Sequence, residues 1–147
     1  DELYKGRISY LLGENKDAIS YLEKAKEHKQ MLASYYLGLA YDANGDSDKA
    51  KKCIAEYIKS GVATSYDLYE LGMQEMQDGN YKNALTYFNS GLELEKVPNK
   101  QNLMKSAIAA YEYSGDFDSA KKMMKEYLKA YPDDEEAKHE NTFLETR

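Results

Sequence analysis

The chain has 147 residues, of which 42% are hydrophobic and 31% charged, a balance typical of one globular domain with its own core. Its formal net charge of −6 argues against nucleic-acid partners, because binding to phosphate backbones depends on clustered lysine and arginine. No run approaches the roughly 18 apolar residues of a membrane span, so we expect no membrane insertion by this chain. The single cysteine, Cys53, excludes an internal disulfide and leaves the compartment open: cytoplasmic, or extracytoplasmic if a leader was removed before Asp1.

A glycine followed five residues later by an alanine occurs four times, at intervals that centre on about 34 residues. The glycines are Gly13, Gly45, Gly79 and Gly115, and the alanines are Ala18, Ala50, Ala84 and Ala120. The similarity extends further, because residues 48–59 align without a gap on residues 118–129 and seven of the twelve positions are identical. The sequence therefore predicts a single domain, 1–147, built from four repeated units.

In chain order, we expect the four units at about residues 1–30, 31–64, 65–98 and 99–132. Apolar residues recur at helical spacing in both halves of a unit, so each unit has room for two helices of about 12 to 14 residues. Pro98 and Pro132 interrupt the pattern and mark the ends of the third and fourth units. The last segment, about 133–145, opens acidic and turns apolar late, which predicts a capping helix.

The turns inside the last three units carry the residues that end one helix and start another. Gly45, Gly79 and Gly115 can each take the left-handed conformation that terminates a helix. The residue after each glycine, which is Asp46, Asn80 or Asp116, is expected to cap the helix that follows. Each unit is therefore predicted to be a helical hairpin.

The two central units share Leu-Gly, alanine and bulky apolar positions at the same spacing: Leu37-Gly38, Ala50 and Ile54, and Leu71-Gly72, Ala84 and Phe88; the second unit adds Tyr41 and the third adds Tyr81. The pattern resembles the tetratricopeptide repeat (TPR) family over about residues 2–131. The resemblance implies an all-α fold, an alpha-alpha superhelix (solenoid) of four TPR-like hairpins with a C-terminal capping helix. It also places small residues where the two helices of a hairpin approach most closely. The fourth unit departs from the pattern, since Ala107-Ile108 stands where the Leu-Gly pair belongs.

In this family the first helices of successive hairpins line a concave groove that holds protein or peptide partners. Carried over position by position, the resemblance implies a groove lined by Arg7, Leu32, Tyr35, Leu39, Tyr66, Tyr69, Met73, Met76, Lys105 and Tyr113. Because the centre of this set is aromatic and apolar, we expect a partner with an apolar or aromatic segment. The same side chains also fit a second interpretation, in which they pack between adjacent first helices.

One subset of the family clamps the C-terminal carboxylate of its partner with basic residues and asparagine on these helices. The matching positions here are Tyr35, Tyr36, Leu39, Asn102 and Ser106. No basic pair stands among them, so this mode of binding is disfavoured.

Enzymatic chemistry, cofactors and metal ions are not expected. His28 and His139 lie far apart, with no cysteine or acidic partner at ligand spacing, and no glycine-rich phosphate loop is present. Cys53 falls on an apolar helix stripe, where we expect a buried side chain. The acidic residues are assigned to turns, caps and outward faces rather than to a matched pair in an apolar pocket, which acid-base catalysis would need.

The sequence thus predicts a scaffold or adaptor module that binds proteins. Two alternatives stay open: a structural fragment of a longer repeat array, or a sensor or regulatory module of a multidomain protein. The fragment hypothesis predicts an open apolar face around Leu3, Ile8 and Tyr10, where a preceding repeat would dock. Fold alone does not choose among these.

Overall fold

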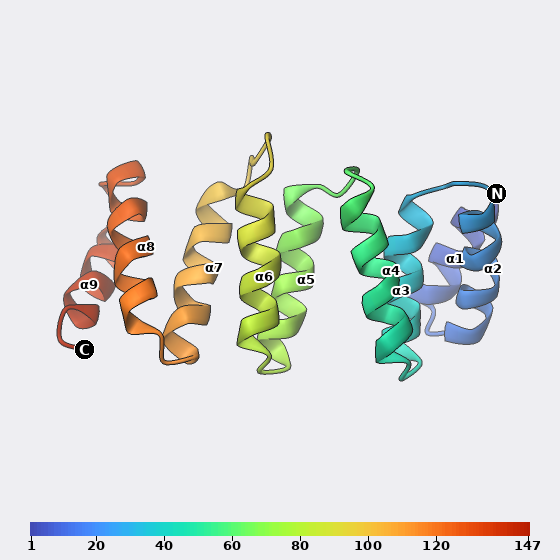
Figure 1. Ribbon diagram of the computed structural model, residues 1–147, viewed down its shortest axis with the longest axis horizontal. Helices are drawn as coiled ribbons and strands as arrows, with labels where there is room; N and C mark the ends of the chain where they lie inside the picture. Colours follow the sequence, from blue (N-terminus) through green and yellow to red (C-terminus); the bar gives the residue numbers. More distant parts are fainter. The chain divides into compact units, whose positions relative to one another are not determined.

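Nine α-helices joined by short turns account for most of the chain, and no β-strand is present (Figure 1). The computed structural model describes residues 1–147, which divide into two compact units, Asp1–Ala63 and Thr64–Arg147. The expected all-α repeat of helical hairpins is confirmed, with a ninth helix after the fourth hairpin. None of the nine helices has the length and apolar character that a membrane crossing requires.

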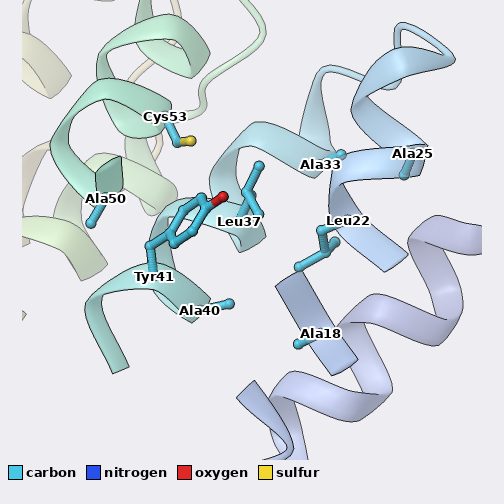
Figure 2. Close-up of a cluster of buried hydrophobic side chains, with 9 residues drawn as sticks. All are labelled: Ala18, Leu22, Ala25, Ala33, Leu37, Ala40, Tyr41, Ala50 and Cys53. Carbon is cyan, nitrogen blue, oxygen red and sulfur yellow. The ribbon is translucent and has the colours of Figure 1, made fainter. Parts of the chain in front are cut away.

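The first unit consists of two hairpins, formed by α1 (Glu2–Leu11), α2 (Asn15–Glu27), α3 (Leu32–Ala43) and α4 (Ser47–Lys59). Since α3 packs against both α1 and α2, the two hairpins share one core (Figure 2). Cys53 is buried in this core, as expected, and Tyr41 is buried beside it with its hydroxyl donating to Glu23 Oε1 at 2.5 Å. Leu3 and Tyr10 are partly buried against the same core, so of the three residues expected around an open apolar face only Ile8 is exposed.

The second unit contains α5 (Ser65–Gln77), α6 (Tyr81–Leu92), α7 (Lys100–Tyr113), α8 (Phe117–Ala130) and α9 (Glu135–Leu144). Helix α7 packs against α5, α6 and α8, whereas α9 packs against α8 alone. Phe88 of α6 and Leu103 of α7 are fully buried in the core between α5, α6 and α7. Tyr127 and Leu144 are fully buried in a second cluster that joins α8 to α9.

The helix ends follow the sequence in most places. Gly13, Gly45, Gly79 and Gly115 all have positive φ angles, between 74° and 87°. Asp46 accepts from the backbone N–H of Lys49, and Asp116 from that of Ser119, so both cap the helices predicted for them. Asn80 makes no such bond at the start of α6, so the predicted cap is wrong there.

Glycine sets the closest approach within three of the hairpins. A Cβ added to Gly38 would lie 2.6 Å from Ile54 Cδ1, and one added to Gly72 would lie 2.3 Å from Phe88 Cε1. Gly6 stands in the same relation to Leu22, at 2.5 Å. These distances are well below van der Waals contact, so each bulky side chain fills the space that the glycine leaves.

The fourth hairpin uses Ile108 at the position of these glycines, and its bulky partner is Met124. Both side chains are buried, and α7 and α8 share less of their length in close contact than the helices of the other three hairpins do. Two large side chains at one crossing keep the backbones further apart. The departure from the repeat pattern therefore loosens this hairpin.

We expect Gly72→Ala to lower the free energy of unfolding by about 1 to 2 kcal/mol. The new methyl group overlaps a phenyl ring that is fully buried, which outweighs the gain in helix propensity of about 1 kcal/mol. Urea unfolding followed by circular dichroism measures the change. Gln74→Ala, at an exposed site on the same helix, is the control and should stay within about 0.5 kcal/mol. In a Phe88→Leu background the Gly72→Ala penalty should shrink, and an unchanged penalty would show that the overlap is not its cause.

Candidate functional site

A pocket of about 490 Å³ lies in the second unit, between α7 and α9. The two helices do not touch along their backbones, because α9 packs only on α8. Helix α8 therefore supplies the floor of the pocket, while α7 and α9 form its sides. Its volume lies within the range of about 300 to 1,000 Å³ that is usual for ligand sites.

The pocket is lined by residues of all three helices and of the chain end: Lys105, Ile108, Ala109, Glu112, Tyr113, Phe117, Met124, Tyr127, Glu136, Ala137, Glu140, Phe143 and Arg147. Ile108 and Met124, the pair at the crossing of the fourth hairpin, are buried in its interior. Tyr113 and Phe143 are 68% and 44% exposed at its edge. The pocket is thus apolar inside and aromatic at its mouth.

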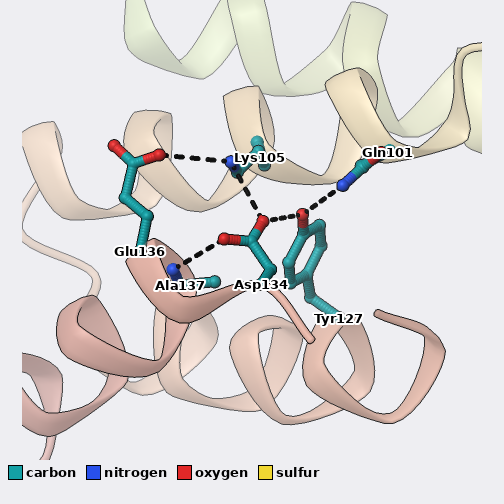
Figure 3. A network of polar contacts seen from close by, with 6 residues as sticks. All are labelled: Gln101, Lys105, Tyr127, Asp134, Glu136 and Ala137. Atoms are coloured by element: carbon teal, nitrogen blue, oxygen red, sulfur yellow. Dashed lines mark hydrogen bonds and ion pairs between the residues drawn. The ribbon is translucent and has the colours of Figure 1, made fainter. Parts of the chain in front are cut away.

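A polar network fixes one end of the pocket (Figure 3). Lys105 Nζ lies 3.1 Å from Asp134 Oδ2 and 3.6 Å from Glu136 Oε2, which ties α7 to the start of α9. The hydroxyl of Tyr127 donates to Asp134 Oδ2 at 2.5 Å and accepts from Gln101 Nε2 at 2.9 Å.

Asp134 is the centre of this network and also the N-cap of α9, accepting from the backbone N–H of Ala137 at 3.0 Å. The hydrogen bond from Tyr127, followed by those from Ala137 and Lys105, lowers the pKa of its carboxyl to about 2. The same contact raises the pKa of Lys105. Both groups are therefore charged at neutral pH, and the charge of Lys105 is offset within the protein.

The other link between α7 and α9 is a pair of carboxyl groups, Glu112 and Glu140. Burial, followed by a hydrogen bond with Glu140 and repulsion from its charge, raises the pKa of Glu112 to about 7. The expectation that acidic residues form no matched pair in an apolar pocket is therefore wrong. Glu112 lies seven positions after Lys105 on α7, and Glu136 and Glu140 of α9 line the same pocket. Only the packing of α9 brings the residues of these two helices together.

Both side chains line the pocket, and the raised pKa of Glu112 is that of one of two acids that share a proton. Hydrolysis of a glycosidic bond by two carboxyl groups needs them about 5 Å apart or more, with the sugar between them. The geometry instead suits the recognition of a cation, which would replace the shared proton. No group of three or more histidine, cysteine or acidic side chains is arranged to hold a metal ion.

The aromatic mouth of the pocket already holds one cation. The guanidinium of Arg147 lies 4.3 Å from the ring centroid of Phe143 and 5.8 Å from that of Phe117. The backbone carbonyl of Arg147 accepts from Lys121 Nζ at 2.7 Å, which holds the chain end against α8.

Of the predicted groove residues in the second unit, only Lys105 and Tyr113 line this pocket. Tyr66 is 56% exposed on α5, away from any described pocket. Tyr69, Met73 and Met76 are partly buried against the core between α5, α6 and α7, which fits the packing interpretation of these side chains. Ser106 Oγ lies 3.7 Å from the sulfur of Met73.

The predicted groove residues of the first unit form an aromatic group of their own. Tyr35 is only 9% exposed, and its ring centroid lies 5.2 Å from that of Tyr36 and 5.3 Å from that of Tyr57. The guanidinium of Arg7 lies 4.8 Å from the Tyr36 ring centroid. Leu32 and Leu39 are half-buried.

Sequence reasoning missed the pocket residues that come from α8, α9 and the chain end. Phe117, Glu140, Phe143 and Arg147 belong to segments that were assigned to packing or capping. The available signal was the late apolar turn of α9, because Phe143 and Leu144 cannot both face α8, and one of them must be left near the surface.

Comparisons with known proteins agree with this fold. The tetratricopeptide repeat model matches residues 32–60 and 101–134. Among solved structures, the nearly identical TPR-like repeats of a kinesin-light-chain-like protein from Podosopora anserina superpose with a TM-score of 0.60 at 15% identity, over 97% of this chain and 83% of that chain. A glutamine-to-methionine variant of that protein gives a TM-score of 0.59 at 15% identity, over 97% and 82%. No curated protein sequence matches the chain.

We expect Glu112→Gln to stabilise the protein above neutral pH and to leave it nearly unchanged at pH 5. The folded-state pKa of about 7 exceeds the ordinary value of 4.5, so the stabilising protonated form is fully present below pH 4.5 and is lost as the pH rises through 7. Glutamine keeps a donor for Glu140 at every pH. Because the site is partly solvated and also holds Lys105, Glu136 and Arg147, we expect a gain of about 1 to 2 kcal/mol at pH 8.

Thermal unfolding at pH 5 and pH 8 measures this difference. The control is Glu126→Gln, at an exposed site on α8, which removes the same charge and should shift both pH values alike. A Glu112→Gln gain that is equal at pH 5 and pH 8 would contradict the shared-proton pair.

Proposed function

We propose that this chain, whose residues 32–60 and 101–134 match the tetratricopeptide repeat model, is a scaffold that binds a segment of another protein on the first-helix side of its hairpins. Repeats of this kind generally serve protein interaction, and tandem hairpins are a scaffold type without catalytic machinery of their own.

The observation that carries the proposal is the pocket between α7 and α9, with Tyr113 and Phe143 exposed at its mouth. Aromatic side chains around an apolar depression are the common anchors of protein interfaces, since they bury a large area at a small cost in conformational entropy. Tyr66 supports the same function as a second exposed aromatic residue on a first helix. We therefore propose a partner with an apolar or aromatic segment.

The predicted groove residues fall into two groups, those that are buried and those that are exposed. Tyr35 is buried and Tyr69 lies 6.3 Å from the Phe88 ring centroid, so substitution at either position would disturb a core. Tyr66 and Tyr113 are exposed and can be changed with little effect on stability. We propose that the exposed members contact the partner and that the buried members support the hairpins.

A second candidate function is stacking within a longer repeat array, which α1 supports. Tyr4, Ile8, Leu11 and Leu12 lie on one side of this helix and are 65%, 39%, 73% and 68% exposed. A contiguous apolar stripe of this kind is characteristic of an interaction surface. A further hairpin would cover it in the way that α3 covers the other side of α1.

We expect Tyr66→Ser/Tyr113→Ser to lose a partner that the unchanged chain captures from lysate of the source cell, with at least about a tenfold reduction in recovered partner. Quantitative mass spectrometry of the captured proteins measures the loss. Circular dichroism should show the same helix content for both baits, because neither tyrosine is buried.

The matched control bait is Leu11→Ser/Leu12→Ser, which changes two exposed apolar side chains on α1. Retention of the partner by this control, together with its loss from the tyrosine variant, supports the scaffold function. Loss from the α1 variant alone would favour stacking instead. Equal capture by all three baits would contradict both proposals.

A further inference from the structure

The pocket between α7 and α9 holds more negative charge than the protein neutralises there. Lys105 is paired with Asp134 and Glu136, so its charge is already offset. No lysine or arginine forms an ion pair with Glu112 or Glu140, the carboxyl groups at the other link between the helices. Glu112 and Glu140 are partly buried and line the same pocket, and a carboxyl pair without a cation holds a proton in its place, in agreement with the raised pKa of Glu112.

The aromatic residues that line the same pocket favour a positively charged group. Phe143 and Phe117 present their ring faces to the guanidinium of Arg147, at 4.3 and 5.8 Å from the centroids. A cation over an aromatic face is attracted by the negative potential of the ring, more strongly when water is excluded. The protein's own arginine thus shows which chemical group the mouth of the pocket accepts.

Carboxylates and aromatic faces together recognise a particular type of side chain. A guanidinium or ammonium group on an aliphatic stem can place its charge between two carboxylates while its methylene groups contact apolar walls. The walls here include Ile108, Met124 and Ala137, all buried. An acidic ligand would instead meet Glu112 and Glu140, which form no ion pair with Lys105 or Arg147 of the same pocket, and a purely apolar one would leave the carboxyl pair without a partner.

We propose that the pocket between α7 and α9 binds an arginine or lysine side chain of the partner segment, between the Glu112–Glu140 pair and the rings of Phe117 and Phe143. The proposal rests on the scaffold function and deepens it, because it adds a basic anchor to the apolar or aromatic segment expected above. In the free protein, Arg147 occupies the aromatic half of the site and competes with the partner's cation.

The test uses three small probes and the whole chain: the N-acetyl methylamides of arginine, norleucine and glutamate. Each is titrated at pH 8 while backbone amide signals of the ¹⁵N-labelled protein are followed by NMR, with attention to Ala109, Ala137 and Glu140. We expect the arginine probe to shift these signals with a Kd of about 1 to 10 mM, and the other two probes to bind at least about tenfold more weakly.

Three variants separate the site from a general effect of charge. Glu112→Gln/Glu140→Gln keeps the shape of the pocket and should weaken the arginine probe by about tenfold, while Glu126→Gln should leave it unchanged. Arg147→Ala should tighten the same probe by about threefold, because the competing guanidinium is removed. At pH 6 the arginine probe should bind the unchanged protein more weakly than at pH 8, since the pair then retains its proton.

The proposal is overturned if the arginine probe causes no localised shifts, if norleucine or glutamate binds as well, or if the double glutamine variant binds arginine as the unchanged protein does. These results are independent of the capture experiment. A partner lost with Tyr66→Ser/Tyr113→Ser but no arginine binding would leave the scaffold function standing without its basic anchor. Arginine binding without a captured partner would leave the pocket standing and contradict the scaffold.

Discussion

The close approach of two helices across one small residue is the constraint on which the hairpins depend. In three of the four, a glycine on the first helix faces a bulky side chain sixteen residues later on the second: Gly6 with Leu22, Gly38 with Ile54, and Gly72 with Phe88. The bulky side chain fills the space of an absent Cβ and is buried at 5% exposure or less. The glycine at the turn of each hairpin lets the chain reverse its direction, and the small buried alanine lets the second helix pack closely on the first.

The fourth hairpin shows what happens when this constraint is relaxed. Ile108 and Met124 occupy the two positions, and both side chains become the interior of a pocket instead of a closed contact. Helix α9 then packs on α8 without reaching α7, in contrast to α3, which reaches α1, and α7, which reaches α5. The candidate site thus arises where the repeat pattern fails, at the one hairpin whose crossing residues are both large.

Side-chain links hold the walls of this pocket in place. Asp134 combines a helix cap, a hydrogen bond from the buried Tyr127 and an ion pair with Lys105, so the start of α9 is fixed to both α7 and α8. Glu112 and Glu140 link the same two helices one turn or more further along. The link at Asp134 is an ion pair between opposite charges, whereas the Glu112–Glu140 pair is stable only while one carboxyl group is protonated. The pocket therefore has one end held by an ion pair and one end whose charge depends on pH.

The sequence by itself determined the repeat, because its signals are local. Glycines at turns, alanines at helix contacts and apolar residues at helical spacing act within one hairpin, and the all-α repeat of hairpins follows from them. It also determined that Cys53 is buried, since its neighbours on the helix face are apolar. The cap expected at Asn80 is absent, because residue type alone does not fix whether a side chain turns toward a free backbone N–H.

The tertiary structure alone decided the site. Whether Tyr35 is exposed or buried depends on Tyr57, a residue of another helix, and the pairing of Glu112 with Glu140 depends on the angle at which α9 meets α8. Neither relation has a fixed spacing along the chain, because each joins residues of two helices that meet only in the folded structure. Local spacing therefore predicted the hairpins, whereas the packing of large residues between them decided which side chains remain available to a partner.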